Sequence, residues 1–178
     1  MKRLILVGGP MGVGKSAVCR ALMERLSRCL YLDGDWCWNM RPFSVTKETR
    51  ALVLDNICSV LARDLRCPEL DHVIFGWVLH QQETIDTILS RLPLEGVEII
   101  NISLLASPEA LRTRLERDMA DGRRPRDGVV ERSLAYLPLY EKLNTWKLDT
   151  TRLTPEEAAA QISRLLEGSA RRCANGPI

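Results

Sequence analysis

Several features that mark special classes of protein are missing from this sequence. No apolar run approaches the roughly 20 residues of a membrane-spanning helix, and the run at 4–7 ends too soon to be the apolar part of a signal peptide. The 25 basic and 23 acidic side chains leave a net charge of +2, which excludes the strongly basic surface of a non-specific nucleic-acid-binding protein. We therefore expect a cytoplasmic protein with no membrane and no nucleic-acid partner.

Cysteine and histidine occur in a pattern that argues against two further classes. The six cysteines are spaced singly, without a CxxC pair, and the chain has only two histidines. A zinc site needs clustered ligands, and a disulfide framework is typical of small secreted chains. This pattern predicts free thiols in a reducing compartment.

The length and composition are those of one ordinary globular domain. The chain has 178 residues, of which 46% are apolar and 27% are charged. No internal repeat, low-complexity tract or linker divides the sequence. We expect a single domain over residues 1–167, followed by a frayed tail at 168–178.

Strand-like and helix-like segments alternate along the domain. Short apolar runs predict strands, and apolar positions spaced by three or four residues predict helices between them. Capping signals support helix starts at Thr46, at Ser107-Pro108 and at Thr154. Because parallel strands need crossover helices, the alternation predicts an α/β domain with a five-stranded parallel sheet. The expected strands are 4–7, 29–32, 72–75, 97–105 and 146–148.

Residues 9–16 form the strongest motif in the chain. They read Gly-Pro-Met-Gly-Val-Gly-Lys-Ser and match the phosphate-binding pattern G-x-x-x-x-G-K-[ST] between a strand and a helix that begins near Lys15. Glycines let backbone N–H groups converge on phosphate oxygens at a helix N-terminus, while Lys15 supplies a charge for the phosphates and Ser16 a hydroxyl for Mg²⁺. The alternative is a glycine turn that only connects strand to helix. The predicted nucleotide-binding residues are Gly9, Met11, Gly12, Val13, Gly14, Lys15, Ser16 and Ala17.

The chain resembles the small P-loop kinases on four segments. These are residues 9–16, the segment 32–35 that reads Leu-Asp-Gly-Asp, the arginine-rich segment 123–126, and the segment 148–151 that reads Leu-Asp-Thr-Thr. It is similar to the branch of gluconate kinase, shikimate kinase, adenylylsulfate kinase and chloramphenicol phosphotransferase, over about residues 2–167. The resemblance implies a P-loop NTPase fold with strand order 2-3-1-4-5, helices on both faces, and a short arginine-rich lid at about 120–128.

The resemblance also implies different roles for two aspartates. Carried over by position, Asp33 lies near Mg²⁺ together with Ser16, and Asp35 faces the acceptor hydroxyl, where a carboxylate orients the oxygen or accepts its proton. Lys15 and Asp35 are thus expected catalytic residues. A simple turn is the alternative, because two aspartates around a glycine are common in turns.

The lid of these kinases supplies a cation to the transferring phosphoryl group. Arginine suits that task because its planar fork contacts two oxygens and stays charged. We predict that Arg123 and Arg126 are catalytic, with Arg124 as a further candidate in the same segment. Arg117 is expected beside the adenine, and the resemblance places Thr151 in the adenine-side loop. The alternative for each lid arginine is a solvated basic loop.

Three of the four tryptophans follow the ends of the second and third expected strands, where substrate-binding residues emerge in parallel sheets. Tryptophan offers a flat apolar face to a ring, and packing in a local core is the alternative for each one. The chain lacks the histidine that gluconate kinases have after the acidic pair and the glycine-rich strand end of shikimate kinases, which counts against those two acceptors. The helix after the third strand is expected to begin at His80. The predicted acceptor site contains Asp35, Trp36, Trp38, Asn39, Arg41, Trp77 and His80.

Together these features predict an ATP- and Mg²⁺-dependent kinase that phosphorylates a hydroxyl of a small molecule, as a monomer or homodimer. A nucleoside or nucleotide, a sugar derivative and an antibiotic are all open as acceptors. The alternatives are a P-loop NTPase that acts as a switch and a nucleotide-binding regulator without a small-molecule acceptor. A switch usually has an acidic residue at the end of a buried strand, and the expected third strand, which reads His-Val-Ile-Phe-Gly-Trp, has none.

Overall fold

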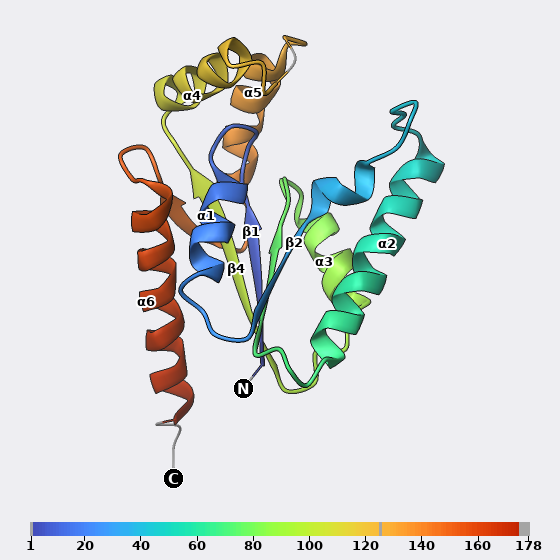
Figure 1. Ribbon diagram of the computed structural model, residues 1–178, viewed down its shortest axis with the longest axis vertical. Helices are drawn as coiled ribbons and strands as arrows, with labels where there is room; N and C mark the ends of the chain where they lie inside the picture. The colour runs from blue at the N-terminus through green and yellow to red at the C-terminus, as the bar shows by residue number, and fades with distance from the viewer. Residues whose placement is uncertain (1, 125, 175–178) are drawn as a thin grey trace.

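Five parallel strands form one sheet in the order β2-β3-β1-β4-β5, which confirms the predicted order (Figure 1). The computed structural model describes residues 2–124 and 126–174. In the central strand, Leu4 and Leu6 face one core while Ile5 and Val7 face the other, and all four are fully buried. Burial on both faces explains the unbroken apolar run in the sequence. The strands are β1 (Lys2–Gly8), β2 (Cys29–Asp33), β3 (His72–Gly76), β4 (Val97–Leu105) and β5 (Trp146–Asp149).

Helices cover both faces of the sheet, as predicted (Figure 1). The pair α1 and α6 packs on one face, and α2 and α3 cover the other. The helices α4 and α5 lie at the carboxyl end of the strands, toward which all five strands point, so the loops that follow the strands meet below them. The elements are α1 (Lys15–Met23), the 3₁₀ helix η1 (Gly34–Trp38), α2 (Lys47–Arg66), α3 (Gln82–Ser90), α4 (Pro108–Ala120), α5 (Val129–Glu141) and α6 (Pro155–Ala174).

The three predicted helix caps are present. Thr46 and Ser107 each accept a hydrogen bond from the backbone N–H three residues further on, at 3.2 Å. At the start of α6, Thr154 and Glu157 exchange hydrogen bonds between side chain and backbone at 3.2 and 2.8 Å. Each cap satisfies N–H groups that have no partner inside the helix.

Two predicted boundaries differ from the structure. The helix α3 begins at Gln82 and not at His80, because Gln81 has the extended backbone of an N-cap, with a φ of −127° and a ψ of 128°. The helix α6 continues through Gly168 to Ala174, where we expected a frayed tail. A single glycine costs a helix only about 1 kcal/mol, so Gly168 does not end it. Residues 175–178 lie outside the described residues.

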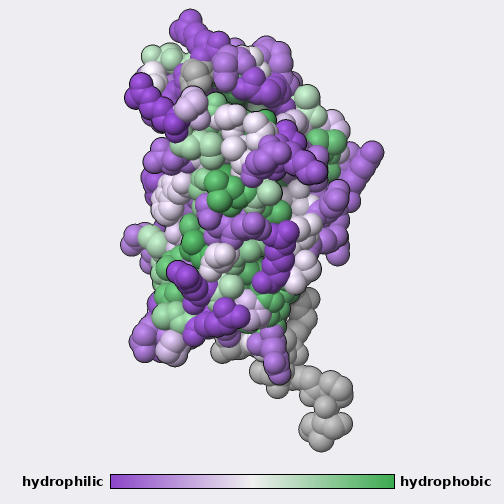
Figure 2. Space-filling view, turned by 90° about the vertical axis from the view of Figure 1, so that its right-hand side faces the viewer, coloured by the Kyte–Doolittle hydropathy of each residue, from purple (hydrophilic) through white to green (hydrophobic). Residues whose placement is uncertain are grey.

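The surface on the α2 side is mostly polar, with hydrophobic residues in scattered patches (Figure 2). Four exposed large hydrophobic side chains belong to α2 and the segment before it: Phe43, Val45, Leu52 and Val60. No helix among the residues that the structure describes combines the length and the apolar character needed to cross a membrane.

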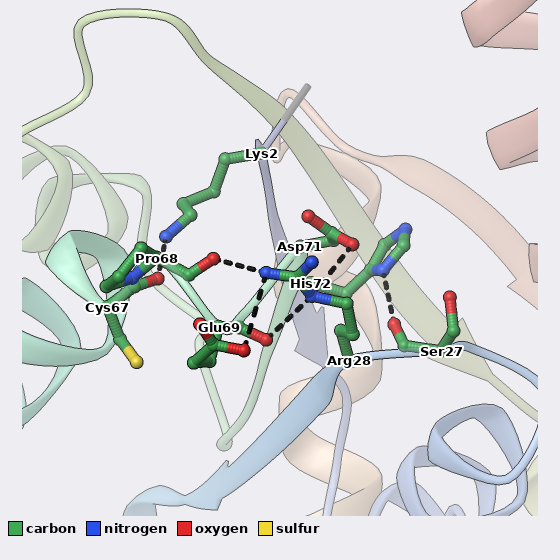
Figure 3. A network of polar contacts seen from close by, with 8 residues as sticks. All are labelled: Lys2, Ser27, Arg28, Cys67, Pro68, Glu69, Asp71 and His72. Atoms are coloured by element: carbon green, nitrogen blue, oxygen red, sulfur yellow. Dashed lines mark hydrogen bonds and ion pairs between the residues drawn. The ribbon is translucent and has the colours of Figure 1, made fainter.

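A polar network closes the amino end of the sheet (Figure 3). Arg28 donates its Nε to the carbonyl of Glu69 at 2.9 Å and lies 3.4 Å from the carboxylate of Asp71. The ring Nδ1 of His72 lies 3.1 Å from the carbonyl of Ser27. These contacts join the α1–β2 turn to the α2–β3 turn. Ligands of α/β sheets bind at the opposite end, where the strands finish, so we look there for the functional site.

Candidate active site

Glycines shape the loop between β1 and α1. Gly12 has a φ of +81°, and a Cβ at this position would lie 2.5 Å from the side chain of Leu115. Gly14 has a φ of +103° and forms the N-cap of α1 without a side-chain cap, and the first turn of α1 contains no acidic residue. The N–H groups and the positive end of the α1 dipole are therefore open to an anion. The loop has the backbone geometry of a phosphate cradle, and the binding of phosphates by its residues stays a prediction.

Lys15 begins α1 and folds back over this loop. Its Nζ donates hydrogen bonds to the carbonyls of Gly9 at 2.8 Å and Pro10 at 3.0 Å. Burial lowers the pKa of Lys15 to about 8, although the nearby carboxylates of Asp35 and Asp33 act in the opposite direction. An ammonium group has three N–H donors, so two hold the loop and one is left for a phosphate oxygen.

Asp33 ends β2 and is fixed by three donors. Its Oδ2 accepts hydrogen bonds from the hydroxyls of Ser16 and Tyr31, both at 2.8 Å, and its Oδ1 accepts the backbone N–H of Asp35 at 3.1 Å. The structure thus brings together Ser16 and Asp33, the predicted Mg²⁺ ligands. Tyr31 was not predicted, although its place two residues before Asp33 puts both side chains on one face of the strand.

No cluster of three or more histidine, cysteine, aspartate or glutamate side chains that could hold a metal ion occurs among the described residues. A metal at Ser16 and Asp33 would therefore take its remaining ligands from phosphate oxygens and water. Mg²⁺ binds in this way, through one or two carboxylates and substrate phosphates. The donor set fits Mg²⁺.

Asp35 follows in η1 and is open to solvent on one side. The protein atoms crowded on its other side raise the pKa of its carboxyl group, and the charge of Asp33 adds to this shift. Lys15, a hydrogen bond from Trp77 and the charge of Arg124 act in the opposite direction. Asp35 is therefore a carboxyl group that lies near two cations and can still be reached by an incoming molecule.

The two lid arginines that we predicted to be catalytic occupy different positions. Arg123 is exposed and forms ion pairs with Asp118 at 3.2 Å and Asp121 at 2.6 Å. Arg126 is exposed and lines a cavity of about 420 Å³ between α4 and α5, to which the phosphate loop does not contribute. Arg123 also lines the cavity beside Gly12 and Val13 of the phosphate loop, which Arg126 does not, and the catalytic roles of both stay predictions.

Arg124, the further candidate in the lid, lies close enough to Lys15 and Asp35 to act on their charges. It is half-buried, and its charge lowers the pKa of both Lys15 and Asp35. Its buried Nε has no hydrogen-bond acceptor, and the carboxylate of Asp118 lies 3.8 Å away. A buried donor without an acceptor is costly. An anion bound beside Lys15 would remove that cost.

A second cavity, of about 350 Å³, lies directly beside the phosphate loop. It is lined by Gly12 and Val13 of the loop, by Arg117 of α4 and by Thr150 and Leu153 in the turn after β5. A nucleotide whose phosphates lie in the loop would extend its ribose and base into this space. The predicted position of Arg117 beside the base agrees with this lining.

Arg114 holds the walls of this cavity together and was not predicted. Its Nη2 donates to the carbonyl of Thr150 at 2.6 Å, and its Nη1 donates to the carbonyl of Val13 at 3.1 Å and to Thr150 Oγ1 at 3.2 Å. The sequence shows an arginine on a helix but gives no sign that its partners lie 101 and 36 residues away.

Thr151 supports the turn after β5 and does not line the cavity. Its hydroxyl donates to Asp149 Oδ1 at 2.5 Å and accepts the backbone N–H of Ser107 at 2.8 Å. The residue of this turn that reaches the cavity is Thr150. The hydroxyls of both threonines are bonded within the protein, so a nucleotide contact of Thr151 through its hydroxyl stays a prediction.

Two of the predicted acceptor residues lie on the turn after β3. Trp77 forms a hydrogen bond with Asp35, and its ring lies so close to Gly34 that a Cβ there would be 2.6 Å from its Cγ. His80 stacks on Tyr136 of α5, with ring centroids 4.3 Å apart and an interplanar angle of 6°. The need for glycine between Asp33 and Asp35 therefore comes from Trp77.

The other predicted acceptor residues are in and just after η1. Trp36 is 57% exposed, and its ring centroid lies 6.0 Å from that of Tyr31. Trp38 packs on the core between α2 and the sheet, so the packing alternative applies to it. Asn39 and Arg41 are exposed.

One face of α5 supplies three contacts that were not predicted. Ser133 is fully buried and donates its hydroxyl to the carbonyl of Met11 in the phosphate loop at 2.6 Å. Tyr140 is also fully buried and donates to the carbonyl of Val78 at 2.6 Å. With Tyr136 they follow the three- and four-residue spacing of a helix face. That spacing is visible in the sequence, but their partners are not.

Comparison with known proteins shows where this geometry belongs. The sequence profile of the AAA domain family matches residues 5–134. The chain belongs to that family and is a small P-loop kinase-like protein.

Among the relatives of this P-loop kinase-like protein, a shikimate kinase of Thermobifida fusca is 30% identical over 173 residues, which cover 91% of this chain and 93% of the relative. A nucleotide-binding protein of Haemophilus ducreyi is 26% identical over 95% of this chain, and this chain spans only 55% of that protein. The solved gluconokinase of Sinorhizobium meliloti has the same fold, with a TM-score of 0.64 and 20% identity over 94% of this chain and 95% of that one. The fold and these relatives support a nucleotide-dependent phosphotransferase in general terms.

Proposed function

We propose that the protein transfers the γ-phosphoryl group of ATP to a hydroxyl of a small molecule, with Mg²⁺ bound at the phosphates. One observation carries this proposal: Lys15, Asp33, Asp35 and Arg124 meet where β1 and β2 end. In this arrangement the two cations, Lys15 and Arg124, would bind phosphate, and Asp33 would bind the metal together with Ser16. The carboxylate of Asp35 faces outward. A nucleotide-binding switch has no use for the outward carboxylate.

The nucleotide would be held by residues whose positions are already described. The glycine loop and the third N–H of Lys15 would bind the phosphates, and the cavity beside Arg117 and Thr150 would take the base. ATP fits this site better than an unphosphorylated ligand, because the first turn of α1 contains no acidic residue and the buried Nε of Arg124 has no hydrogen-bond acceptor among the described residues. Mg²⁺ bound at Ser16 and Asp33 would neutralise charge on the phosphates.

Asp35 would act on the acceptor. Its open carboxylate orients the attacking hydroxyl and takes up the proton that this oxygen loses as its bond to phosphorus forms and ADP leaves. The hydrogen bond from Trp77 favours the ionised form of the Asp35 carboxyl group. Arg124 adds positive charge on the lid side of the same space.

The test combines a product search with one substitution. The protein is incubated with Mg-ATP and a panel of nucleosides, nucleoside monophosphates, sugar acids and hydroxylated antibiotics, and mass spectrometry looks for a product that has gained one phosphoryl group. We expect Asp35→Asn to lower the transfer rate by about 10²-fold or more, the range for a general base, and to change ATP affinity less than about threefold. The control is Asp86→Asn, an exposed carboxylate on α3.

Two results would refute the proposal. The first is ATP hydrolysis that no member of the panel accelerates. The second is a phosphorylated product whose rate of formation is the same for Asp35→Asn and for the wild-type protein.

A further inference from the structure

A hollow of about 620 Å³ lies along α2, on the face of the molecule that α2 and α3 cover. It is larger than the cavity of about 350 Å³ beside the phosphate loop, and no residue lines both. Three small and four charged side chains form its lining, and three of the charged ones are arginines. We call this hollow the arginine groove. Its lining residues are Asp55, Cys58, Ser59, Ala62, Arg63, Arg66 and Arg91.

Short side chains on α2 explain why the surface is hollowed here. Ser59 and Ala62 lie on one stripe of the helix with Asp55 and Arg66, at spacings of four, three and four residues. Such a stripe runs for about 16 Å along the helix axis. Because the two middle residues are small, the longer side chains at both ends of the stripe and Arg91 after α3 leave space between them.

The carboxylate that lines the arginine groove is already neutralised. Asp55 Oδ1 lies 2.6 Å from Arg91 Nη1, in an ion pair that joins α2 to the end of α3. A guanidinium group has five N–H donors, so Arg91 can bind Asp55 and a second anion together. With three arginines and one aspartate, the lining has an excess of positive charge.

The other two arginines have no partner among the residues that the structure describes: neither Arg63 nor Arg66 forms a hydrogen bond or an ion pair through its side chain. Basic side chains in the last turn of a helix often bind its free carbonyls. Here Lys2 does so instead, donating to the carbonyls of Leu65 at 2.8 Å and of Cys67 (Figure 3). Like charges three residues apart on a helix repel each other. An anion in the groove would replace this repulsion by two attractions.

We propose that the arginine groove binds a phosphorylated small molecule, with its phosphate held by Arg63, Arg66 and Arg91. The planar fork of arginine contacts two phosphate oxygens at once, and Ser59 adds a hydroxyl to the same lining. Small molecules bind in concave sites, which favours such a ligand over an acidic protein segment. The groove has room for more than one phosphate group, so the ligand carries an organic part or a second phosphate. The proposal is independent of the proposed function, because the groove shares no residue with the candidate active site.

The test is a titration followed by NMR, in which backbone amide signals report each site separately. Pyrophosphate is added to the isotope-labelled protein, and sodium chloride at the same ionic strength is the reference, because salt alone screens exposed charges. We expect the amides of Ser59, Ala62 and Arg63 to follow a saturable curve with a Kd below about 1 mM. The amides of Lys15 and Ser16 report the phosphate loop in the same spectra, so binding there is not mistaken for binding in the groove.

Substitution of both unpaired arginines connects binding to the groove. The double substitution Arg63→Gln and Arg66→Gln should weaken pyrophosphate binding in the groove by about tenfold or more and leave the curve of the phosphate-loop amides unchanged. The matched control is Arg20→Gln with Arg25→Gln, which removes the same charge from exposed positions outside the groove. This control should keep groove binding within about threefold of the wild-type protein, since only the long-range effect of net charge is lost.

The titrations separate a built site from an ordinary basic surface. Shifts in the groove that are absent, that fail to saturate or that chloride reproduces would each show a solvated surface and overturn the proposal. Equal binding by the wild-type protein and the groove variant, or an equal loss in the control, would overturn it as well. A poly-glutamate peptide that binds the groove more tightly than pyrophosphate would replace the small molecule by a protein partner. Saturable binding that prefers pyrophosphate and depends on Arg63 and Arg66 is the expected result, whether or not the protein transfers phosphate.

Discussion

Replacement of Arg114 by alanine tests whether this side chain connects the two walls of the nucleotide cavity. Its strongest hydrogen bonds run to the carbonyls of Thr150 at 2.6 Å and Val13 at 3.1 Å. A hydrogen bond that involves a charged group contributes about 1.5–3 kcal/mol, so two such bonds give about 3–6 kcal/mol. The guanidinium is only half-buried, and the carbonyl of Thr150 keeps a second donor, the N–H of Leu153 at 3.2 Å. We therefore expect a loss of about 2–4 kcal/mol in the free energy of unfolding.

Urea denaturation measures this loss, and calorimetric titration with Mg-ATP measures its effect on binding. At a slope of about 2 kcal/mol per molar urea, the midpoint should fall by about 1–2 M. ATP affinity should fall by about tenfold or more, because Val13 lies in the phosphate loop and Thr150 beside the base cavity. The matched control is Arg112→Ala, which removes an exposed arginine from the same helix and should change stability by less than about 0.5 kcal/mol.

Arg114→Lys separates charge from geometry. A lysine keeps the positive charge but has no planar fork that can reach two carbonyls at once. We expect it to recover less than half of the lost stability and little of the ATP affinity. The reasoning fails if Arg114→Ala matches Arg112→Ala in stability, or if it loses stability while its ATP affinity stays unchanged.

Two further predictions concern the loops around the nucleotide. Gly12→Ala should cost about 2–5 kcal/mol in unfolding free energy and abolish measurable ATP binding, since it adds left-handed strain and a clash with Leu115. The control is Gly122→Ala, where nothing lies within 4 Å of the new Cβ. Urea denaturation of this control should show only the strain of about 1–2 kcal/mol. The hydrogen bonds from Thr151 hold the pKa of Asp149 below its usual 3.8, so Asp149 stabilises the fold above that pH and the contribution is lost as the pH falls through the lower pKa of the folded state. Thermal unfolding between pH 3 and 6 should show that Asp149→Asn flattens this part of the acid dependence, and an unchanged curve would contradict the assignment.

The parts of the fold that the sequence predicted are those specified by local chemistry. The central strand needed only its unbroken apolar run, and the caps at Thr46, Ser107 and Thr154 needed only side chains that satisfy nearby N–H groups. The strand order is a different kind of prediction, because it came from the resemblance and not from periodicity. The start of α3 was wrong because the extended conformation of Gln81 has no local signal in the sequence.

The site was predictable where one segment contains the whole motif. The phosphate loop is such a segment, and the segment that ends β2 fixes Asp33 and Asp35 on either side of Gly34. The lid was less predictable, since the burial and the ion pairs that distinguish its arginines form only in the folded chain. The partners of Arg114 and of the tyrosines on α5 are likewise distant in sequence and could not be predicted from it.

Helix α5 contacts both the phosphate loop and the turn after β3 and so fixes their relative position. It begins directly after the lid, and along one face it contacts the phosphate loop through Ser133, His80 through Tyr136 and the carbonyl of Val78 through Tyr140. A helix is stiff over these two turns, so the three contacts keep a constant spacing. One helix thus holds the phosphate loop and the turn after β3 at a fixed spacing. Phosphoryl transfer depends on such fixed distances between the reacting groups.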